Sequence, residues 1–597
     1  MALNIRAEEH VDDAVDIYYN NVDTELSGYA LMALGGTAAL ILAWNGSYRL
    51  TCYVRQIATL NNERQHYFRR AYRWLAAFRK HILYAPLFRT RHHREYQLSR
   101  AVNMGTLPSR SHTLLLIGIL ALNVTLCTIN VPYGTDRTAG VIRNRAGTLA
   151  VTNLIPLVLL AGRNNPLISL LRIPYDTFNL FHRWFGRIVV LEALTHAFSW
   201  LIPKAQGIGW NGVVMIFKES GFIRAGLVAV CAFAFILVHS PSPIRHAFYE
   251  TFLHVHIAVV ATVLVTLWIH LDHRPAQSLL LAAIVLWGLE RLARVTAIIY
   301  RNCGRRLTVA VIESLPDDLL RIALYMPRPW HIKPGQHVYL CIPTIGLWTT
   351  HPFSVAWSDA DPDEDYDHDN EHPNPKGALY LLVRRRSGFT DSLAKRVTKT
   401  SSGVLPIHAI VEGPYGEIHS MDSYGTVMLF AGGAGITHHL PYISHLVRGH
   451  AKGIVAAQRI TLVWAIRSPG YLEAIQPWLD RMMRDNKGGR EHERETKGGN
   501  REEVEEVSDT VASVLRILVY VTGASDEPLP RSRFRTMQVM AGRPSFGTLI
   551  RWEAEKQVGA MAVVCCGPGG FSDDVRRACR KAQRRTEIVL FEESFTW

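Results

Sequence analysis

Two apolar segments with histidines at one repeated spacing constrain this chain more than any other feature. Each segment is long enough to cross a bilayer. His182 and His196 lie 14 residues apart in the first, and His256 and His270 lie 14 residues apart in the second. A helix advances about 1.5 Å and about 100° per residue, so histidines at this spacing nearly share a face and lie about 21 Å apart. Histidine inside a membrane span marks a functional site by default.

The repeated spacing predicts two metal centres stacked along two neighbouring helices. Such helices would offer one histidine pair near each membrane face, which suits two haems that each take two imidazoles as axial ligands. A lone histidine in an apolar helix is more often hydrogen-bonded to a neighbour, but the repeat of the spacing favours ligands. His254 fits poorly, because it lies two residues before His256 and therefore on roughly the opposite face. The four predicted ligands are His182, His196, His256 and His270.

The composition indicates a protein that is part membrane bundle and part soluble module. The chain has 597 residues, of which 48% are apolar, so two or three domains are expected. The net charge of +14 could indicate a nucleic-acid partner, but much of it lies between two apolar spans. From Arg49 to Arg110 there are 13 Lys and Arg against Glu63 and Glu95. The positive-inside rule favours a cytosolic loop against anionic lipid there, so no nucleic-acid partner is predicted.

The apolar segments predict an α-helical membrane bundle of about seven spans. The predicted parts are a tail at 1–26, a first span at 27–46, a basic cytosolic loop at 47–111 and a haem-binding bundle at 112–300. Counting spans from the cytosolic loop places everything after residue 300 in the cytosol. The acidic N-terminus does not resemble a signal peptide, so the first span should remain as an anchor. The predicted spans are 27–46, 112–131, 147–161, 180–202, 222–240, 249–271 and 278–300.

After residue 300 the sequence changes to short strand-like runs and Gly/Pro turns. Residues 301–420 predict an all-β barrel, and residues 421–597 alternate strand and helix signals as in an open α/β sheet. Two charged insertions, 359–376 and 485–509, are predicted to be disordered surface loops. The eight cysteines show no metal-ligand spacing and imply no disulfide framework.

A flavin site is predicted in the β part. His351-Pro352-Phe353-Ser354 lies at the end of a predicted strand, and some 30 residues later Arg384 is followed by Gly388-Phe389-Thr390. A basic side chain beside a turn that opens a helix suits a pyrophosphate, which arginine and helix N-termini both favour. The arginine run alone would be more typical of a solvated surface.

Two glycine turns predict a dinucleotide crevice in the α/β part. The strand 427–431 enters a turn with Gly432, Gly433, Gly435 and Thr437, and the strand 561–566 enters Gly567-Pro568. Glycines allow close approach of the backbone to a diphosphate at the carboxyl edge of a sheet. The C-terminal Trp597 could stack on a flavin ring, although a terminal tryptophan could equally fill a packing gap.

In this order, the motifs resemble the fungal ferric-chelate reductases, a family related to the NADPH oxidases, over nearly all the chain from about residue 110. Singly most of the motifs are weak, but their order is highly specific. They include Arg145–Ala150, His182-Arg183-Trp184, Tyr249-Glu250, His351–Ser354, Glu412–Gly416, Ala431–Thr437, Val463–Arg467, Cys566–Gly569 and the ending Glu593–Trp597.

The resemblance implies two b-type haems in the membrane bundle, with FAD and NADPH in a cytosolic ferredoxin–NADP reductase-like module. Cys566 would lie near the nicotinamide, and Trp597 would shield the flavin until the nicotinamide displaces it. Arg543 is a candidate for the NADP 2′-phosphate, and no carboxylate stands out for a ribose 2′-hydroxyl, which favours NADP over NAD. By matched position the other implied site residues are His182 with His256 (inner haem), His196 with His270 (outer haem), His351, Pro352, Phe353 and Ser354 (flavin ring), Arg384, Gly388 and Thr390 (flavin pyrophosphate), and Gly432, Gly433, Gly435, Thr437, Arg467, Gly567 and Pro568 (dinucleotide).

The implied activity is electron transfer from NADPH through FAD and two haems to an acceptor outside. The expected acceptor is a ferric chelate or siderophore, or cupric ion, with an iron permease or oxidase uptake system as partner. The plasma membrane is the expected location, with the vacuolar membrane as the alternative.

Two other functions stay open. One is an NADPH oxidase that reduces dioxygen, although the second histidine pair of those relatives is spaced 13 rather than 14. The other is a non-enzymatic transporter or receptor with a nucleotide-sensing tail, which the four in-span histidines and the terminal aromatic residue oppose.

Overall fold

The computed structural model divides the chain into two compact units. The first comprises Met1–Gly46, Tyr96–Gly105 and Ser111–Arg294, and the second comprises Ser47–Glu95, Thr106–Arg110 and Val295–Trp597. The structure describes residues 2–60, 64–88, 92–96, 105–347, 349–359, 377–416, 419–495, 514–523, 536–583 and 586–593.

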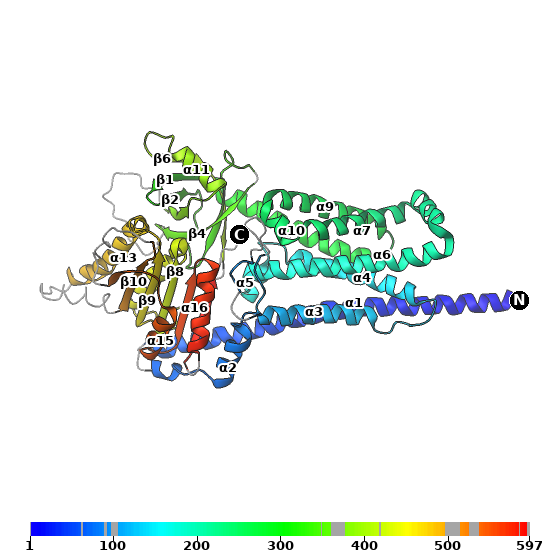
Figure 1. The fold of residues 1–597 in the computed structure, drawn as a ribbon, viewed down its shortest axis with the longest axis horizontal. Coiled ribbons are helices and arrows are strands. Elements are labelled where there is room, and N and C mark those ends of the chain that lie inside the picture. Colours follow the sequence, from blue (N-terminus) through cyan, green and yellow to red (C-terminus); the bar gives the residue numbers. More distant parts are fainter. Residues whose placement is uncertain are drawn as a thin grey trace. The chain divides into compact units, whose positions relative to one another are not determined.

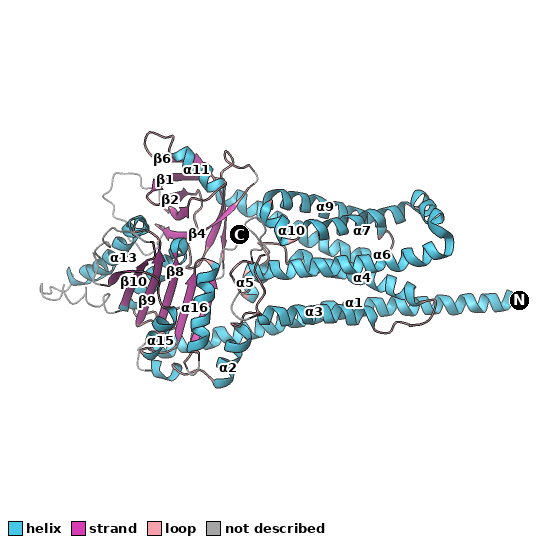
Figure 2. Ribbon diagram, in the orientation of Figure 1, coloured by secondary structure: helices cyan, strands magenta, loops and turns pink. Residues whose placement is uncertain are grey.

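The first unit is helical (Figures 1 and 2), and its long helices pack through apolar faces. Its core joins residues of five helices, among them Val151, Val189, Phe233, Val263 and Leu280. The helices are α1 (Ala2–Thr59, to Gly46 in this unit), α3 (Arg110–Thr128), α4 (Thr138–Leu159), α5 (Pro166–Leu171), α6 (Tyr175–Glu219), α7 (Gly221–His239), α8 (Ser242–Ala247), α9 (Tyr249–His270) and α10 (Ala276–Asn302, to Arg294 in this unit).

Five helices among the described residues are long and apolar enough to cross a membrane. They are Ala14–Thr59 of α1, then α3, α6, α7 and α9. The other two predicted spans, 147–161 and 278–300, are helical as parts of α4 and α10 but do not belong to these five. Both helices contain charged residues, Arg143 and Arg145 in α4 and Glu290 and Arg291 in α10.

Two helices are longer than the sequence predicts. The tail 1–26 and the span 27–46 form one helix with the residues that follow, because Ala2–Thr59 contains no proline to end it. Helix α6 continues past residue 202 to Glu219, with Pro203 inside it and a break at Gly209, where φ is +69°. Glycine tolerates this left-handed conformation, so the chain kinks there and then resumes its helix.

The second unit contains an antiparallel sheet in the order β6-β1-β2-β5-β4-β3-β7. Alternating buried residues such as Ile312, Ile322 and Leu381 form its core, which the helix α11 (Phe389–Val397) joins through Leu393. The strands are β1 (Val309–Leu315), β2 (Leu319–Tyr325), β3 (His337–Cys341), β4 (His351–Ser358), β5 (Leu379–Arg384), β6 (Val404–His408) and β7 (Ile410–Tyr415).

The second unit also contains a parallel sheet in the order β11-β10-β9-β8-β12-β13. Helices α12 (Ile436–Ala451) and α13 (Gly470–Glu495) pack on one face, and α15 (Phe546–Glu555) and α16 (Gly569–Ala582) pack on the other. Parallel strands covered on both faces are apolar throughout, as the fully buried Met561–Cys566 illustrates. The strands are β8 (Thr426–Gly432), β9 (Arg459–Ile466), β10 (Leu515–Val521), β11 (Met537–Ala541), β12 (Met561–Cys566) and β13 (Ile588–Glu593).

Part of the predicted basic loop 47–111 packs on this parallel sheet. It forms η1 (Gln65–Phe68), α2 (Arg73–Phe78) and η2 (Arg79–Leu83). The Glu587 N–H donates to the Arg69 carbonyl at 3.0 Å, Arg79 pairs with Glu587 at 2.7 Å, and the Leu590 N–H donates to the Tyr84 hydroxyl at 3.1 Å. The segment therefore covers the β13 edge of the sheet, instead of being only a solvated loop.

The two charged insertions fall mostly outside the described residues. Residues 360–376 and 496–513 are not described, whereas α13 continues as a helix to Glu495, into the segment 485–509 that the sequence predicts to be disordered.

Candidate functional site

The structure brings the four predicted histidine ligands together as two pairs. Helix α6 carries His182 and His196, and α9 carries His256 and His270. The ring centroids of His182 and His256 are 6.3 Å apart with an interplanar angle of 83°. The ring centroids of His196 and His270 are 6.1 Å apart at 84°. The two pairs have nearly the same geometry, as the common spacing of 14 predicts.

Backbone carbonyls orient three of these imidazoles. The Nδ1 atoms of His182, His196 and His270 lie 2.9, 2.8 and 2.9 Å from the carbonyl oxygens of Leu157, Arg143 and Phe222. A carbonyl only accepts, so each Nδ1 carries the proton and each Nε2 keeps its lone pair. This is the arrangement that prepares a histidine to bind a metal through Nε2. The fourth ring, His256, has no hydrogen-bond partner for Nδ1 among the described residues.

Two glycines make room for the outer pair. A Cβ atom at Gly147 of α4 would lie 2.6 Å from His196 Nδ1, and one at Gly226 of α7 would lie 2.7 Å from His270 Cε1. Both distances are too short for a side chain, so each ring occupies space that only glycine leaves open. Gly226 carries no sequence signal for this role, since nothing in the sequence connects it with a histidine 44 residues later.

The pairs fit a metal held between two imidazoles. A metal about 2.0–2.1 Å from each ring nitrogen would place the two ring centroids about 6 Å apart, which is the separation of both pairs. Within the described chain, no group of three or more His, Cys, Asp or Glu is placed to hold a metal ion. Each pair therefore offers two ligands, and a porphyrin would complete the set. The assignment of these histidines to haem stays a prediction.

A buried carboxyl group that sequence reasoning missed lies on the same helix as the first two histidines. Glu192 of α6 is buried, and Asn153 Nδ2 of α4 donates to its two oxygens at 3.1 and 3.0 Å. The same amide is 2.7 Å from Asn123 Oδ1 of α3. The signal in the sequence is an acidic residue inside an apolar span. Burying such a residue costs free energy, so its presence there marks a functional site by default.

A second buried polar contact ties α1 to α4. Arg145 donates from Nε to Asp23 Oδ1 at 2.8 Å, and both side chains are almost fully buried. Arg145 also donates to the Ile129 carbonyl. The two charges therefore form a buried ion pair, in which Arg145 Nη2 has no hydrogen-bond partner among the described residues.

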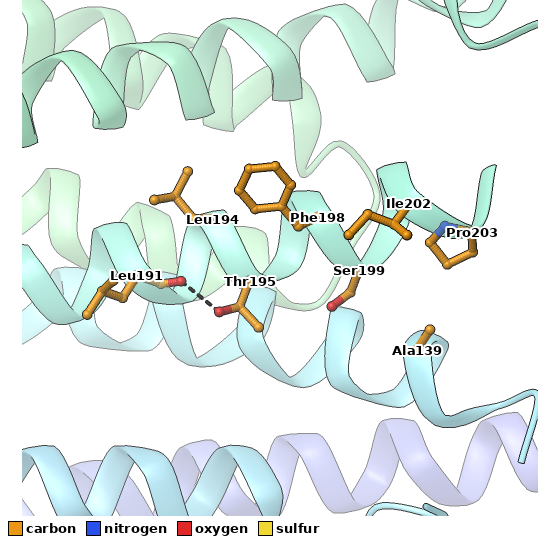
Figure 3. A pocket seen from close by; sticks show the side chains of 8 residues that line it. All are labelled: Ala139, Leu191, Leu194, Thr195, Phe198, Ser199, Ile202 and Pro203. Carbon is orange, nitrogen blue, oxygen red and sulfur yellow. Dashed lines mark hydrogen bonds between the residues drawn. The ribbon is translucent and has the colours of Figure 1, made fainter. Parts of the chain in front are cut away.

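A groove of about 460 Å³ runs along α6 between Leu191 and Pro203 (Figure 3). Most of its lining residues lie on one face of α6, and His196 is not among them. The Thr195 hydroxyl donates to the Leu191 carbonyl at 2.9 Å, so the lining is mainly apolar. Its residues are Ala139, Leu191, Leu194, Thr195, Phe198, Ser199, Ile202 and Pro203.

The predicted flavin residues lie at neighbouring ends of β4 and α11. His351 stacks on Phe389 with ring centroids 4.4 Å apart, and Phe353 lies 6.4 Å from the same ring. Gly388 adopts φ +89° at the start of α11, which favours glycine. The Thr390 hydroxyl donates to the Arg386 carbonyl at 2.9 Å and closes the turn.

Two of the remaining flavin candidates lie on β4, and the candidate for the pyrophosphate is exposed to solvent. Pro352 and Ser354 lie on β4, Arg384 ends β5 with an exposed side chain, and Arg385 pairs with Asp391 at 2.7 Å. An exposed Arg384 beside the opening turn of a helix could contact a pyrophosphate.

The two predicted glycine turns meet where the strand order reverses. The chain adds strands on one side of β8 and then crosses to β12 on the other, which creates the switch point where α/β sheets bind ligands. A Cβ at Gly432 would lie 2.8 Å from Pro568 Cδ, and one at Gly435 would overlap the Cys566 carbonyl. The structure therefore brings Gly432, Gly433, Gly435 and Thr437 next to Cys566, Gly567 and Pro568.

Trp464 forms a hydrogen bond with the first glycine turn, a contact that the sequence does not predict. Its fully buried indole donates from Nε1 to the Gly433 carbonyl at 2.9 Å. Gly433 has φ +56°, so the bond stabilises a backbone conformation that favours glycine.

The other predicted residues of this site lie at the same sheet edge or outside the described chain. Cys566 is buried, and burial, with smaller effects of Glu593 and Cys565, raises the pKa of its thiol well above the ordinary value. Arg467 follows β9 and the exposed Arg543 follows β11, so both lie at the carboxyl edge. Trp597 lies outside the described residues, and its predicted role stays a prediction.

Three family profiles match successive parts of the chain. Residues 146–267 match the ferric reductase like transmembrane component, residues 304–419 match an FAD-binding domain, and residues 424–580 match the ferric reductase NAD binding domain.

Curated fungal proteins are similar over most of the chain. Ferric/cupric reductase transmembrane component 2 of Saccharomyces cerevisiae is 26% identical over 551 residues, which are 88% of this chain and 72% of that protein. Ferric reductase transmembrane component 3 of the same yeast is 27% identical over 83% of this chain and 68% of its own length. Ferric/cupric reductase transmembrane component 1 of Candida albicans is 25% identical over 87% and 67%.

This chain is a homologue of the fungal ferric reductases. The predicted resemblance and the predicted fold class are confirmed: a ferric reductase transmembrane domain with apolar helices precedes an FAD- and NAD(P)-binding module. In this ferric reductase homologue, the transmembrane match contains His182, His196 and His256 and ends three residues before His270. The other two matches contain β1–β7 and β8–β12.

Proposed function

We propose that this protein moves electrons from cytosolic NADPH across a membrane to a ferric chelate or siderophore, or to cupric ion, in support of iron uptake. The observation that carries the proposal is the pair of two-histidine sites on α6 and α9, each with ring centroids about 6 Å apart. They occur in a chain that also has FAD- and NAD-binding domains. The names of the fungal relatives, ferric and ferric/cupric reductases, support the metal acceptor.

The histidine pairs would hold two b-type haems, His182 with His256 the inner one and His196 with His270 the outer one. Bound FAD would supply a hydride acceptor for NADPH, and bound haems would supply one-electron carriers. The chain's own residues would orient these groups. The carbonyls of Leu157, Arg143 and Phe222 hold three of the imidazoles with Nε2 available.

The soluble residues would bind and orient the other two cofactors. The strand residues His351, Phe353 and Ser354 would flank the flavin ring, and Arg384 and Thr390 would contact its pyrophosphate. The Gly432–Thr437 turn would cradle the dinucleotide. Its closeness to Cys566 supports this proposal, because the buried thiol would lie near the nicotinamide and stay protonated at neutral pH. Arg467 and Arg543 at the carboxyl edge favour a dinucleotide with a 2′-phosphate, which is NADPH.

The proposed location is the plasma membrane, with the soluble module in the cytosol and the outer histidine pair towards the acceptor. Reduction there would release ferrous iron, which an iron permease or oxidase system would take up.

Anaerobic stopped-flow absorbance on the detergent-solubilised protein tests the proposal. NADPH should reduce the haem bands, and a ferric chelate added next should reoxidise them. A protein without haem bands, or with haem that NADPH never reduces, would refute the electron-transfer function. Reoxidation by oxygen but not by ferric chelate would replace the metal reductase with an oxidase.

A histidine two residues away provides a matched control. His256→Ala should lose the inner haem and all transfer from flavin to ferric chelate, since one imidazole remains in that pair. His254→Ala should retain both haems, because His254 is exposed and its Nδ1 is bonded to the Glu250 carbonyl of its own helix at 2.7 Å. Equal haem loss in both variants would contradict the ligand assignment.

A further inference from the structure

A short stretch between the first two apolar helices lies on the nucleotide-binding domain. The backbone N–H groups of His92, His93 and Arg94 all donate to the carboxylate of Asp573 in α16. The N–H of His92 is 3.2 Å from both oxygens, that of His93 is 3.0 Å from Oδ1, and that of Arg94 is 3.1 Å from Oδ2. Asp573 is 5% exposed. Three successive amides that surround one buried carboxylate form a specific anion nest.

The same stretch lies against the first turn of α16. Gly569 begins this helix, three residues after Cys566, and a Cβ there would overlap the carbonyl oxygen of His93. The two backbones approach closely, so the position of Gly569 and that of residues 92–94 depend on each other.

A second contact extends from this stretch to the last strand. Arg576, three residues after Asp573 on α16, donates from Nε to Glu592 Oε1 at 2.9 Å and also from Nη2 to Oε2. Its Nη2 lies 3.2 Å from His93 Nε2. Burial would raise the pKa of the Glu592 carboxyl, but Arg576 and His93 more than offset it, so the pKa falls to about 2. The carboxylate is therefore charged, and α16, β13 and His93 meet at one buried ionic contact.

These contacts converge on the turn that would bind the nicotinamide. Residues Cys566–Gly569 connect β12 to α16, and Cys566 lies beside Glu593 of β13 in the sheet register. The Cys566 carbonyl in turn touches Gly435 of the first glycine turn. Any shift of the α16 N-terminus would therefore move the strand-end turn relative to Gly432–Thr437.

We propose that residues 92–94, named here the clamp segment, position the dinucleotide site through Asp573. This inference rests on the proposed function. Asp573 is a positioning residue: it binds no substrate itself, but through it the clamp segment fixes the N-terminus of α16 and with it the Cys566–Gly569 turn. Asp573 should therefore affect the rate of flavin reduction by NADPH, and it should not affect the later rate of haem reduction.

The test compares three variants of the full-length protein with both haems and FAD. Asp573→Ala removes the acceptor of the three amides, and Asp573→Asn keeps the size and one acceptor oxygen but removes the charge. Asp574→Asn is the matched control, because the neighbouring side chain is 51% exposed and pairs with Arg577 within its own helix at 3.1 Å.

Two separate rates distinguish positioning from general damage. The first is flavin reduction by NADPH as a function of NADPH concentration, and the second is haem reduction after the flavin is reduced by light. Asp573→Ala should raise the half-saturating NADPH concentration, lower the limiting rate of flavin reduction, or do both. The ratio of the limiting rate to that concentration should fall about tenfold. Asp573→Asn should lie between this variant and wild type. The light-driven rate, haem content and FAD content should not change.

The clamp is refuted if Asp573→Ala and Asp574→Asn show the same NADPH dependence, or if Asp573→Asn loses FAD and slows both rates alike. The failure of the proposed function has a different signature, since NADPH would then fail to reduce the wild-type protein.

Discussion

At the scale of single residues, the candidate haem sites depend as much on small neighbours as on the histidines. Three imidazoles take their orientation from main-chain carbonyls, which any residue type supplies. The outer pair also needs Gly147 and Gly226, whose missing side chains leave space for the rings. A histidine can therefore be present at the right position and still fail as a ligand if its surroundings change.

Gly226→Ala tests this dependence. The added methyl group would lie 2.7 Å from the His270 ring, so the ring must rotate away from His196. We expect the haem content to fall from about two to about one per chain, because only the outer pair is disturbed. Haem is measured by its absorbance against protein concentration in purified, detergent-solubilised protein.

Gly186→Ala is the control, since its Cβ would lie 3.7 Å from Leu157 Cδ1, an ordinary contact. A Gly226→Ala protein with full haem content would show that the outer ring can move without losing its ligand role.

At the scale of elements, helix α12 is tied to the segment before β8 by a histidine whose charge depends on pH. His445 Nε2 lies 2.8 Å from Asp422 Oδ1. This hydrogen bond raises the pKa of His445, and burial opposes the increase without cancelling it. The contact therefore stabilises the start of the nucleotide-binding domain only while His445 is charged.

The expected pH dependence follows from the direction of that shift. The folded state binds the proton more tightly than the unfolded state, so the stabilisation is complete below about pH 6.5 and is lost as the pH rises through the raised pKa. Thermal unfolding is monitored through the FAD fluorescence that rises when the flavin is released. The melting temperatures of wild type and His445→Gln should differ most at about pH 6 and converge by about pH 9. Asp422→Asn should remove the same pH dependence. A difference that stays constant over this range would exclude the ion pair as its cause.

The elements also show which features the sequence could predict. The histidine pairs and glycine turns follow local rules of spacing and strand ends, so they could be predicted. The hydrogen bond from Trp464 to Gly433, the nest around Asp573 and the cover on β13 could not, because they join residues far apart in the sequence. All three contacts also use backbone groups, which carry no sequence signal. The sequence predicts a span of only 27–46 within the helix Ala2–Thr59, because apolar length marks a membrane span and not the ends of a helix.

At the scale of the whole molecule, the proposed function requires donor and acceptor to react from opposite sides of a bilayer. In vesicles with a ferric chelate inside and NADPH outside, ferrous iron should form inside for the fraction of molecules whose soluble module faces outwards. A ferrous-specific dye trapped in the lumen measures it. His254→Ala should match wild type, whereas His256→Ala should abolish the signal. Ferrous iron that appears only after the vesicles are lysed would mean that both reactions occur on one side.

The contact between Arg79 and Glu587 also has a consequence for how the chain is made. These residues are 508 positions apart, and Tyr84 and Leu590 are 506 apart. At about 5–20 residues per second, the ribosome needs about 25–100 s to make the intervening chain. Throughout this interval the segment 64–88, whose Tyr84 is buried in the complete fold, has no sheet edge to cover. A premature stop within the last strand would therefore leave the segment 64–88 without the strand edge that it covers.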